Sequence, residues 1–399
     1  MRKRVLARPK PIIEKHQEEN GEIKNNGSLE KAHSAKKSPG FCKNLCKAFQ
    51  IVILIVLIPP FLNYAALQKE QAELRPIKGE LYDIGWEQKL FKMCQGKGPP
   101  TVVFDSPIGM NSDVWAHIWP AIAKNARVCI YDRAGLGFSD RPKENSTDSD
   151  GTEMKSNLQN KWSPFTVERM ADDLYRLMSQ SSQEPQPFLI VGAELGALVA
   201  QFYAQMFDNQ VLGIVLINPL SEDLFEQDGG SWLHYWYSQL IPSFQSLQLS
   251  AALGITRLAL ILGLISHPMA KSGMPEDVEN RQKFLLCHPR HLSSVVDEHH
   301  FMNISFSQLR TIRLLKSLPT NISVTVLSGN YYDEQMPSYL NKAWAKSEQN
   351  LINKHYPQAN HIVINSSDRH MLIKNYDAII EQINKIIRLY KSKLKSRKF

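Results

Sequence analysis

Cysteine is scarce in this chain of 399 residues. Its five cysteines are too few for a disulfide framework. Cys94 and Cys287 can pair only if the fold brings them together, and Cys129 lies in an apolar run that predicts a small buried side chain. Cys42 and Cys46 precede a long apolar segment, where a reduced or S-acylated thiol is expected. We predict no metal site and no cofactor.

The main part of the chain also lacks an excess of charge of either sign. The formal net charge is +8, but residues 1–47 hold twelve Lys or Arg against five Glu, so the remainder is nearly neutral. This distribution argues against a nucleic-acid partner. Residues 1–47 are polar and aperiodic and are predicted to form a disordered basic arm. A second basic run at the C-terminus is expected to be a solvated end.

One segment has no charge over about 20 residues, which is the length that a bilayer core requires. We predict a transmembrane signal anchor at residues 48–67. Pro59 and Pro60 interrupt its aliphatic run, so a buried or interfacial helix is the alternative. Because the basic arm precedes the segment, the positive-inside rule predicts a cytoplasmic N-terminus and a lumenal or extracellular main domain.

Four acceptor sequons for N-glycosylation agree with that topology. They begin at Asn145, Asn303, Asn321 and Asn365, all within the predicted main domain. Sequons also occur by chance, and three domain cysteines without an obvious pair argue mildly against a lumenal location. The predicted location is therefore the endomembrane system or the cell surface.

Beyond the anchor, apolar extended runs alternate with helical patterns. The expected strands are residues 101–105, 127–131, 188–191, 212–217 and 324–327, and the expected helices are residues 114–124, 167–179, 195–207 and 339–354. This alternation predicts an α/β fold with a mostly parallel sheet covered by helices on both faces. The main domain is predicted to span residues 80–399.

Two segments interrupt the alternation. Residues 143–163 are polar and aperiodic and are predicted to form a surface insertion. Residues 221–317 are mostly helical and are predicted to form a cap over the sheet. Within the cap, residues 247–266 are expected to form one lid helix, because Arg257 would be costly inside a bilayer. Contact with the nearby membrane, or with a ligand under the cap, is the alternative to ordinary core packing.

Residues 131–140 read YDRAGLGFSD, which resembles the loop after a central strand in α/β-hydrolase-fold proteins of the esterase, lipase and epoxide-hydrolase type. The flanking segments keep the same order. TVVFDSPIGMNSDVW resembles the strand and oxyanion loop, and FLIVGAELGALVAQFYAQMF resembles the strand, turn and helix that hold the nucleophile. The resemblance runs from about Glu80 to the C-terminal helix and implies a hydrolase-like sheet with a helical cap.

The nucleophile position is occupied by Glu194. A serine hydrolase needs its nucleophile on a sharp strand-to-helix turn between small residues, and here Gly192 and Gly196 flank a glutamate. The oxyanion loop departs from the family as well, because Asp105 and Ser106 stand where many relatives have His-Gly. A carboxylate there would repel the developing negative charge unless only backbone N–H groups point inward.

The resemblance also implies the remaining catalytic positions. His370 follows the last expected strand and is the candidate histidine, whereas His361 lies within that strand. Asp333 is the candidate acid, one residue later than the family pattern, with Asp223 as the alternative. We expect Glu194 and His370 to form an ion pair at the top of the sheet.

Three functions fit these residues. The first is a non-catalytic hydrolase homologue that acts by binding at a membrane, and whose protein partner the sequence does not identify. The second is an active hydrolase on an apolar ester, epoxide or lipid that uses Glu194 and His370. The third is a structural membrane protein with a collapsed pocket. Fold resemblance alone does not separate them.

Overall fold

A computed structural model describes residues 39–85, 87–142, 163–180, 184–270, 272–330, 333, 336–365 and 370–396, with the side chains of residues 39–45, 51, 52, 55 and 56 excepted. Residues 53–399 form one compact unit, and the fold below is the fold of that unit. The predicted basic arm and the predicted insertion at 143–163, with Asn145, lie outside the described residues except at their ends.

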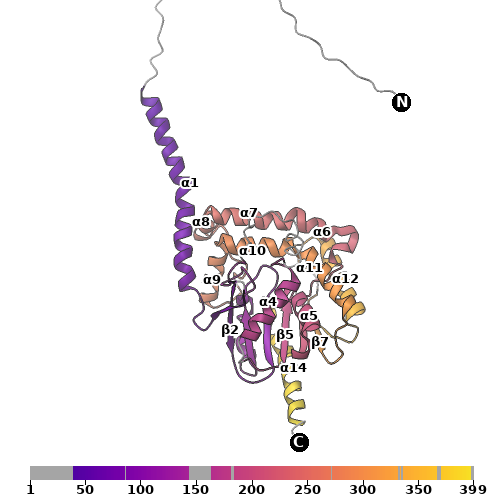
Figure 1. The fold of residues 1–399 in the computed structure, drawn as a ribbon. Coiled ribbons are helices and arrows are strands. Elements are labelled where there is room, and N and C mark those ends of the chain that lie inside the picture. The colour runs from indigo at the N-terminus through magenta and orange to yellow at the C-terminus, as the bar shows by residue number, and fades with distance from the viewer. Residues whose placement is uncertain are drawn as a thin grey trace, which may run out of the picture. The chain divides into compact units, whose positions relative to one another are not determined.

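A single sheet of eight described strands runs through the unit (Figure 1). The strands are β1 (Glu80–Asp83), β2 (Lys89–Gln95), β3 (Thr101–Asp105), β4 (Arg127–Tyr131), β5 (Phe188–Ala193), β6 (Val211–Ile217), β7 (Ser323–Ser328) and β8 (Asn360–Val363). Their order is β1-β2-β4-β3-β5-β6-β7-β8, and only the β1–β2 and β2–β4 pairs are antiparallel. The predicted mostly parallel sheet is therefore confirmed.

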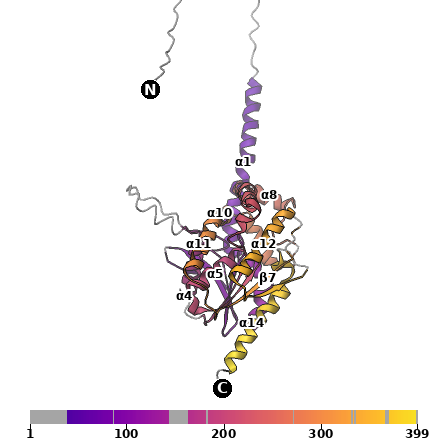
Figure 2. The ribbon, with the colours of Figure 1, turned by 90° about the vertical axis from the view of Figure 1, so that its right-hand side faces the viewer.

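Side chains that alternate along the central strands enter two cores. Val103 and Ile190 belong to the core that also holds α4 (Val167–Gln180), α5 (Leu195–Met206) and α12 (Ser338–His355). Val102 and Val191 belong to the core that holds α2 (Trp119–Ile122) and α14 (Tyr376–Ser396). Apolar residues on both faces are what a parallel sheet between two helical layers requires, and Figure 2 shows helices on both sides of it.

The strands expected at residues 101–105 and 127–131 have these same bounds in the structure. The expected helix at residues 114–124 is shorter and irregular: a 3-10 turn, Ser112–Trp115, precedes the one-turn helix α2. The strands β1 and β2 were not predicted. They add an antiparallel edge to the sheet ahead of the hydrolase-like pattern.

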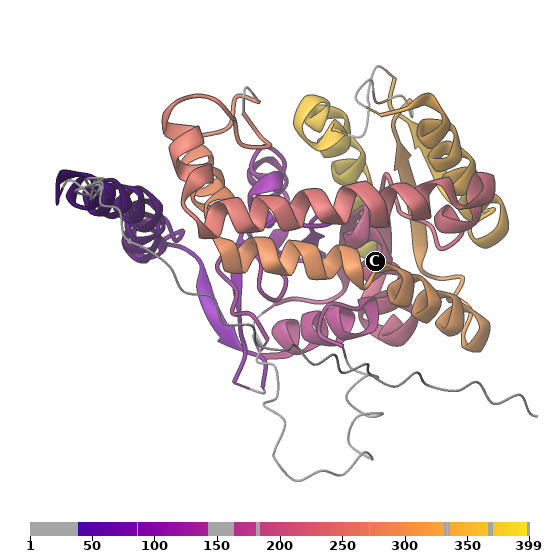
Figure 3. The ribbon, with the colours of Figure 1, turned by 90° about the horizontal axis from the view of Figure 1, so that it is seen from above.

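Helices fill the chain between β6 and β7, where the cap was predicted. They are η3 (Leu224–Gly230), α6 (Ser231–Tyr235), the π-helical turn η4 (Trp236–Leu240), α7 (Ile241–Ala252), α8 (Ile255–Ile261), α9 (Glu276–Leu286), α10 (Pro289–His300) and α11 (Met302–Leu315). Figure 3 shows α7 and α10 side by side over the sheet. The predicted single lid helix at 247–266 is wrong, because Gly254 takes a left-handed φ of 73° and separates α7 from α8.

The predicted anchor, residues 48–67, lies within helix α1 (Pro39–Glu73). Among the described residues, no single helix has the length and hydropathy needed to cross a membrane. One bent pair, Leu224–Ala252 followed by Ile255–Ile261 at an angle of 84°, meets that test by length and composition.

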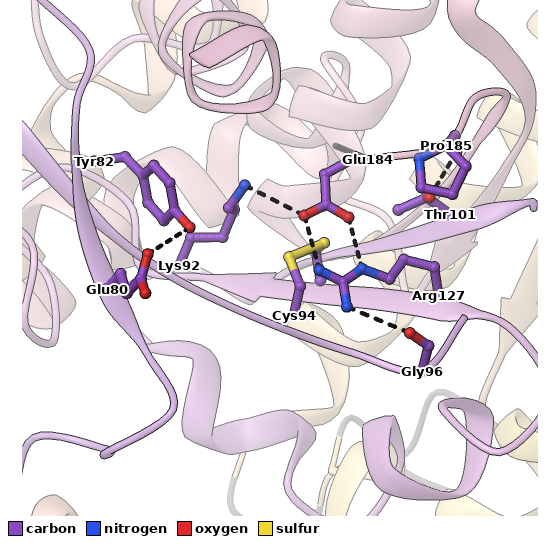
Figure 4. The surroundings of a disulfide bond; sticks show 10 residues. Glu80, Tyr82, Lys92, Cys94, Gly96, Thr101, Arg127, Glu184 and Pro185 are labelled. Atoms are coloured by element: carbon purple, nitrogen blue, oxygen red, sulfur yellow. Dashed lines mark hydrogen bonds and ion pairs between the residues drawn. A yellow bond between two sulfur atoms is a disulfide. The ribbon is translucent and has the colours of Figure 1, made fainter. Parts of the chain in front are cut away.

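Cys94 and Cys129 form a disulfide (Figure 4). The two residues face each other across the antiparallel pair β2–β4, with their Cα atoms 4.1 Å apart. Cys129 is buried, as its apolar run predicted, but it is bonded to Cys94, so Cys94 does not pair with Cys287. Cys287 is a free, buried thiol, and burial raises its pKa to about 11.

We expect the Cys94–Cys129 bond to stabilise the fold measurably. It spans 35 residues, and a loop of that size corresponds to about 4 kcal/mol of lost unfolded-state entropy. Reduction should lower the thermal midpoint of the wild type but leave a Cys129→Ser variant, already destabilised, unchanged. A Cys287→Ser variant is the control and should respond to reductant as the wild type does. Recovery of both thiols alkylated from unreduced protein made in a secretory cell would contradict the bond.

Candidate functional site

The candidate site is centred on a sharp turn between β5 and α5. Glu194 occupies the turn with φ 48° and ψ −107°, a conformation that a non-glycine residue rarely adopts. Its backbone N–H donates to the carbonyl of Ile217 at 3.0 Å. A strained strand-to-helix turn of this kind projects its central side chain from the sheet edge. Glu194 is half-buried there.

The two flanking glycines allow this turn because no side chain fits at either position. A Cβ on Gly192 would lie 2.1 Å from the carbonyl oxygen of Gly196. A Cβ on Gly196 would lie 2.4 Å from the carbonyl oxygen of Asp105. Both separations are far below a normal contact, so the backbone, not the identity of the central residue, fixes the turn.

Glu194 lines a cavity of about 200 Å³ between the sheet and the cap. His370 lines the same cavity and is exposed, immediately before the short helix α13 (Met371–Lys374). The other lining residues are mostly apolar or aromatic: Pro107, Ile108, Met110, Val114, Leu220, Trp232, Tyr235, Trp236, Leu240, Phe244, His299, Trp344, Leu372 and Ile373. The structure thus brings two of the predicted site residues to one apolar cavity.

Tryptophans of the cavity wall are fixed by hydrogen bonds within the protein. The indole N–H of Trp232 donates to the carbonyl of Leu340 at 2.8 Å, and that of Trp236 donates to the carbonyl of His299 at 2.8 Å. Both side chains are buried. Because these polar atoms are already satisfied, the two rings offer a ligand apolar surface.

His299 is a cavity residue that sequence reasoning missed. Its Nδ1 lies 2.7 Å from the carbonyl oxygen of Val295. A carbonyl only accepts, so Nδ1 carries a hydrogen, and Nε2 is the acceptor whenever the ring is neutral. His299 lies on cap helix α10, outside every segment that resembles a hydrolase motif, and no local pattern distinguishes it from His300.

The carboxylate of Asp105 is neutralised by its neighbours. Asp105 is completely buried, and its oxygens accept from Arg133 Nη1 at 2.6 Å and from the hydroxyl of Tyr131 at 2.7 Å. Burial, followed by the charge of Asp105, raises the pKa of Tyr131 well above its ordinary value, so it remains a donor. Asp105 therefore does not present an unopposed charge to the cavity.

Ser106 is also engaged in the loop. Its hydroxyl accepts from the indole N–H of Trp115 at 3.1 Å, and the residue is buried. The backbone carbonyls of Ser106 and Pro107 accept from Arg133 at 2.5 and 2.7 Å. The loop that would stabilise an oxyanion in a hydrolase is here organised around one buried guanidinium.

Glu298 extends this network to the cap. Arg133 Nε donates to Glu298 Oε1 at 2.7 Å, and the backbone N–H of Gly109 donates to Glu298 Oε2 at 2.7 Å. Burial opposes the charged form of Arg133, but Glu298 and Asp105 outweigh it and raise the pKa of Arg133. Buried ionic contacts therefore connect helix α10 to the oxyanion loop.

The candidate acids have different environments. Asp333 is buried, and its backbone N–H and carbonyl pair with the side chain of Asn341 at 3.0 and 2.9 Å. It is not among the described residues that line the cavity. The carboxylate of Asp223 accepts from four side chains of the cap and α12: Ser221, Gln227, Ser347 and Asn350. These contacts make Asp223 a structural junction.

His361 is separate from the cavity, as its place in β8 suggested. Its Nε2 lies 2.9 Å from the hydroxyl of Ser328, and burial lowers its pKa. One cluster of potential metal ligands occurs in the described part of the chain: Cys94, Cys129 and Glu184. Its two sulfurs are joined in the disulfide, and Glu184 is bonded by Arg127 at 2.7 and 3.1 Å (Figure 4). A disulfide and a paired carboxylate do not form a metal site.

Comparisons with known proteins agree with this geometry. Residues 100–254 match the family model described as the alpha/beta hydrolase fold. The chain has the α/β-hydrolase fold. A curated relative, the uncharacterized protein YqjL of Bacillus subtilis, is 23% identical over 129 residues, a match that spans 43% of that protein's length.

Solved structures of hydrolases superpose on most of the chain. A putative epoxide hydrolase from Pseudomonas aeruginosa is 15% identical, with a TM-score of 0.55, over 79% of this chain and 97% of that one. The Cif epoxide hydrolase from Acinetobacter nosocomialis is 13% identical, with a TM-score of 0.59, over 82% and 96%. A putative lipase from Acinetobacter baumannii is 15% identical, with a TM-score of 0.53, over 83% and 97%. At these identities the likeness shows the fold alone.

The hydrolase-like loop at residues 131–140 is fixed by Asp132 from within and by the cap from outside. Asp132 accepts from the backbone N–H groups of Ser112 at 2.8 Å and Phe138 at 3.0 Å. From the cap, His291 Nδ1 accepts from the backbone N–H of Gly137 at 3.2 Å. Burial, with a smaller effect of His288, lowers the pKa of His291 from 6.5 to about 3.

This shift predicts an acid-sensitive contact between the cap and the loop. Between pH 6.5 and 3 the unfolded chain binds a proton at His291 that the folded chain excludes, so stability is full above pH 6.5 and falls as the pH is lowered. By pH 5 the loss due to His291 should be about 2 kcal/mol. Denaturant unfolding of the wild type and of a His291→Gln variant at pH 7 and pH 5 measures it as the smaller loss in the variant. Substitution of exposed His234 should leave the pH dependence unchanged, and equal losses in wild type and His291→Gln would contradict the assignment.

Proposed function

We propose that this chain is a membrane-anchored, non-catalytic homologue of α/β hydrolases that binds an apolar small molecule or lipid under its cap. The observation that supports the proposal is the position of Glu194. It occupies the nucleophile turn and lines a cavity whose wall is mostly apolar or aromatic. A cavity of about 200 Å³ argues against a purely structural protein with a collapsed pocket.

Serine-type hydrolysis does not fit these groups. A glutamate has no hydroxyl to be deprotonated and acylated, which is the first step of that mechanism. The nearby hydroxyl of Ser106 accepts from Trp115, and Pro107 has no N–H with which to stabilise an oxyanion. The buried Arg133 is directed to the carboxylates of Asp105 and of Glu298 on the cap, and to carbonyls of the loop.

An active enzyme with altered chemistry is the second candidate. The cavity holds a carboxylate and two imidazoles, those of His370 and His299, and the similar structures include epoxide hydrolases. In this candidate Glu194 attacks an apolar ester or epoxide, and His370 acts as the base. Among the classes that the sequence resembles, epoxide hydrolases use an aspartate at this turn. The added methylene of glutamate displaces the oxygen by about 1.5 Å, and a misplacement of about 1 Å can cost about a hundredfold in rate.

We further propose that residues 48–67 anchor the chain and that the main domain is lumenal or extracellular. The charge asymmetry around this segment supports the orientation. Asn303 and Asn321 are exposed, as glycosylation requires, and so is Asn365. The Cys94–Cys129 disulfide also supports an oxidising compartment, because such bonds seldom persist in the cytosol. The sequence showed no obvious pair among the domain cysteines, and this bond removes that argument against a lumenal location.

Ligand binding tests the main proposal. A brominated medium-chain alcohol should quench the fluorescence of cavity tryptophans in the full-length protein, because Trp232, Trp236 and Trp344 line the cavity. An Ile108→Phe variant, which reduces the cavity, should bind at least about tenfold more weakly, or about 1.4 kcal/mol. Leu315→Phe on the exposed face of α11 is the matched control and should bind normally.

The catalytic alternative gives a different result in the same preparation. The proposed function predicts no labelling by a fluorophosphonate and no turnover of a panel of apolar esters and epoxides. Turnover that Glu194→Gln abolishes, with probe binding retained, would establish the alternative. Failure of the brominated alcohol to quench any cavity tryptophan, in protein shown to be folded, would contradict the binding function.

Membrane topology is tested by extraction and glycosylation. The full chain expressed in a secretory cell should remain with the membrane after alkaline carbonate treatment. Glycosidase treatment should increase its mobility, and the Asn303→Gln and Asn321→Gln changes together should reduce that shift. Asn330→Gln, which removes an asparagine outside any sequon, is the control. Resistance to carbonate without any glycan would leave the anchor but overturn the orientation.

A further inference from the structure

A large aliphatic surface is exposed at the end of the cap. Its residues lie on the last part of α7, on α8 and on the turn that follows: Leu249, Leu253, Ile255, Leu258, Ile261, Leu262, Leu264 and Ile265. Ile261, Leu262 and Leu264 are each at least 70% exposed. We call these eight side chains the α8 surface. A contiguous apolar surface of this kind on a folded domain marks an interaction site.

The α8 surface has almost no charge to hydrate. Across residues 241–266 only Arg257 is charged. Its guanidinium is bonded by both carboxylate oxygens of Glu70 at 2.6 and 2.7 Å, and by Asn63 Oδ1 at 2.7 Å. In the sequence, the charge of Arg257 argued against membrane contact. In the structure this charge is paired, on the side of the segment that faces α1.

The same contacts fix the α7–α8 turn to helix α1 (Figure 1). The buried amide of Asn63 donates to the carbonyls of Ala251 at 2.9 Å and Cys287 at 3.2 Å. A Cβ on Gly254 would lie 2.4 Å from the carbonyl oxygen of Pro59, so the two backbones touch. The cap and this part of α1 cannot separate without exposing buried polar groups.

Beside this junction, α1 exposes its own aliphatic and aromatic side chains. They are Ile53, Leu54, Leu57, Ile58, Phe61, Leu62 and Tyr64. These residues belong to the proposed anchor, and the contacts of Asn63 and Gly254 place their helix next to the α8 surface. This part of α1 and α8 must therefore lie in the same medium, either water or lipid.

The length of the proposed anchor determines how deeply the α8 surface lies in the membrane. From Lys47, the last charge before the apolar run, only residues 48–58 precede the contact at Pro59. Eleven helical residues rise about 17 Å, whereas the hydrocarbon core is about 30 Å thick. The remaining thickness must be spanned by the part of α1 to which the cap is already attached.

We propose that the α8 surface is immersed in the outer leaflet of the membrane that α1 crosses. This proposal rests on the proposed anchor. A bilayer is the occupant that the surface fits, because a protein interface has a polar rim and hydrogen bonds, and residues 258–265 offer only aliphatic side chains, alanine and glycine. Helix α7 begins beside the cavity, where Leu240 and Phe244 line it, and ends at the α8 surface. One helix thus joins the ligand cavity to the lipid.

A polarity-sensitive fluorophore tests the immersion in full-length protein reconstituted into phosphatidylcholine vesicles. The fluorophore is attached to Leu262→Cys, and to Leu314→Cys on α11 as the matched control, since both leucines are highly exposed. Cys42 and Cys46 are replaced by Ser. Cys287 can remain, because burial raises its pKa to about 11 and slows alkylation. We expect blue-shifted emission at position 262 that doxyl-labelled lipids quench at least twofold and aqueous iodide does not, with the reverse at position 314.

Each alternative outcome of this experiment would contradict the proposal for a different reason. Iodide quenching at position 262 in carbonate-resistant protein would place the surface in water while the anchor stands. Shielding from both quenchers would show that a second copy of the chain covers it. Protein that leaves the vesicles on carbonate treatment would overturn the anchor itself. A Leu262→Cys variant that fails to fold is replaced by Leu264→Cys on the adjacent turn.

Discussion

The contact between the sheet, the oxyanion loop and the cap depends on one buried cation, Arg133. It is buried between Asp105 at the end of β3 and Glu298 on α10, and it also holds the carbonyls of the loop after β3. Removal of one partner from such a group leaves an uncompensated charge, which typically costs about 3 to 5 kcal/mol. Arg133 therefore connects the end of β3, the oxyanion loop and the cap through one buried side chain.

That network determines what the site can do. In a working hydrolase the loop after β3 offers donors to a developing oxyanion, and those donors must be free to point inward. Here the loop is directed toward Arg133, and Asp105 supplies the negative charge that the guanidinium requires. The turn at Glu194 packs against the same loop, because a Cβ on Gly196 would collide with the backbone of Asp105 and Ser106. The glycines allow this close approach whatever side chain the central residue of the turn carries.

Sequence reasoning succeeded where local pattern fixes local structure. The strands at residues 101–105 and 127–131 follow from apolar runs, and the turn at Glu194 and the loop at residues 131–140 were expected from the resemblance to α/β-hydrolase-fold proteins. It failed where contacts between segments far apart in the chain determine the structure. The Cys94–Cys129 bond depends on the register of β2 against β4, and His299 reaches the cavity only because α10 crosses the sheet. Arg133, the partner of Asp105, lies in the loop at residues 131–140, but only the parallel pairing of β3 and β4 brings the two residues together.

The break between α7 and α8 was also beyond sequence reasoning, and it changes how the cap is understood. Arg257 argued for a helix packed on the sheet domain, on the assumption that a charge within an apolar run faces either lipid or water. In the structure it faces Glu70 and Asn63 of α1 instead. A polar interior and an aliphatic exterior are what a helix pair needs in lipid, where polar groups must be satisfied between helices. Asn63 of α1 has the same role, because its side chain bonds Arg257 and two carbonyls of the cap, so both polar residues are compatible with the proposed lipid location.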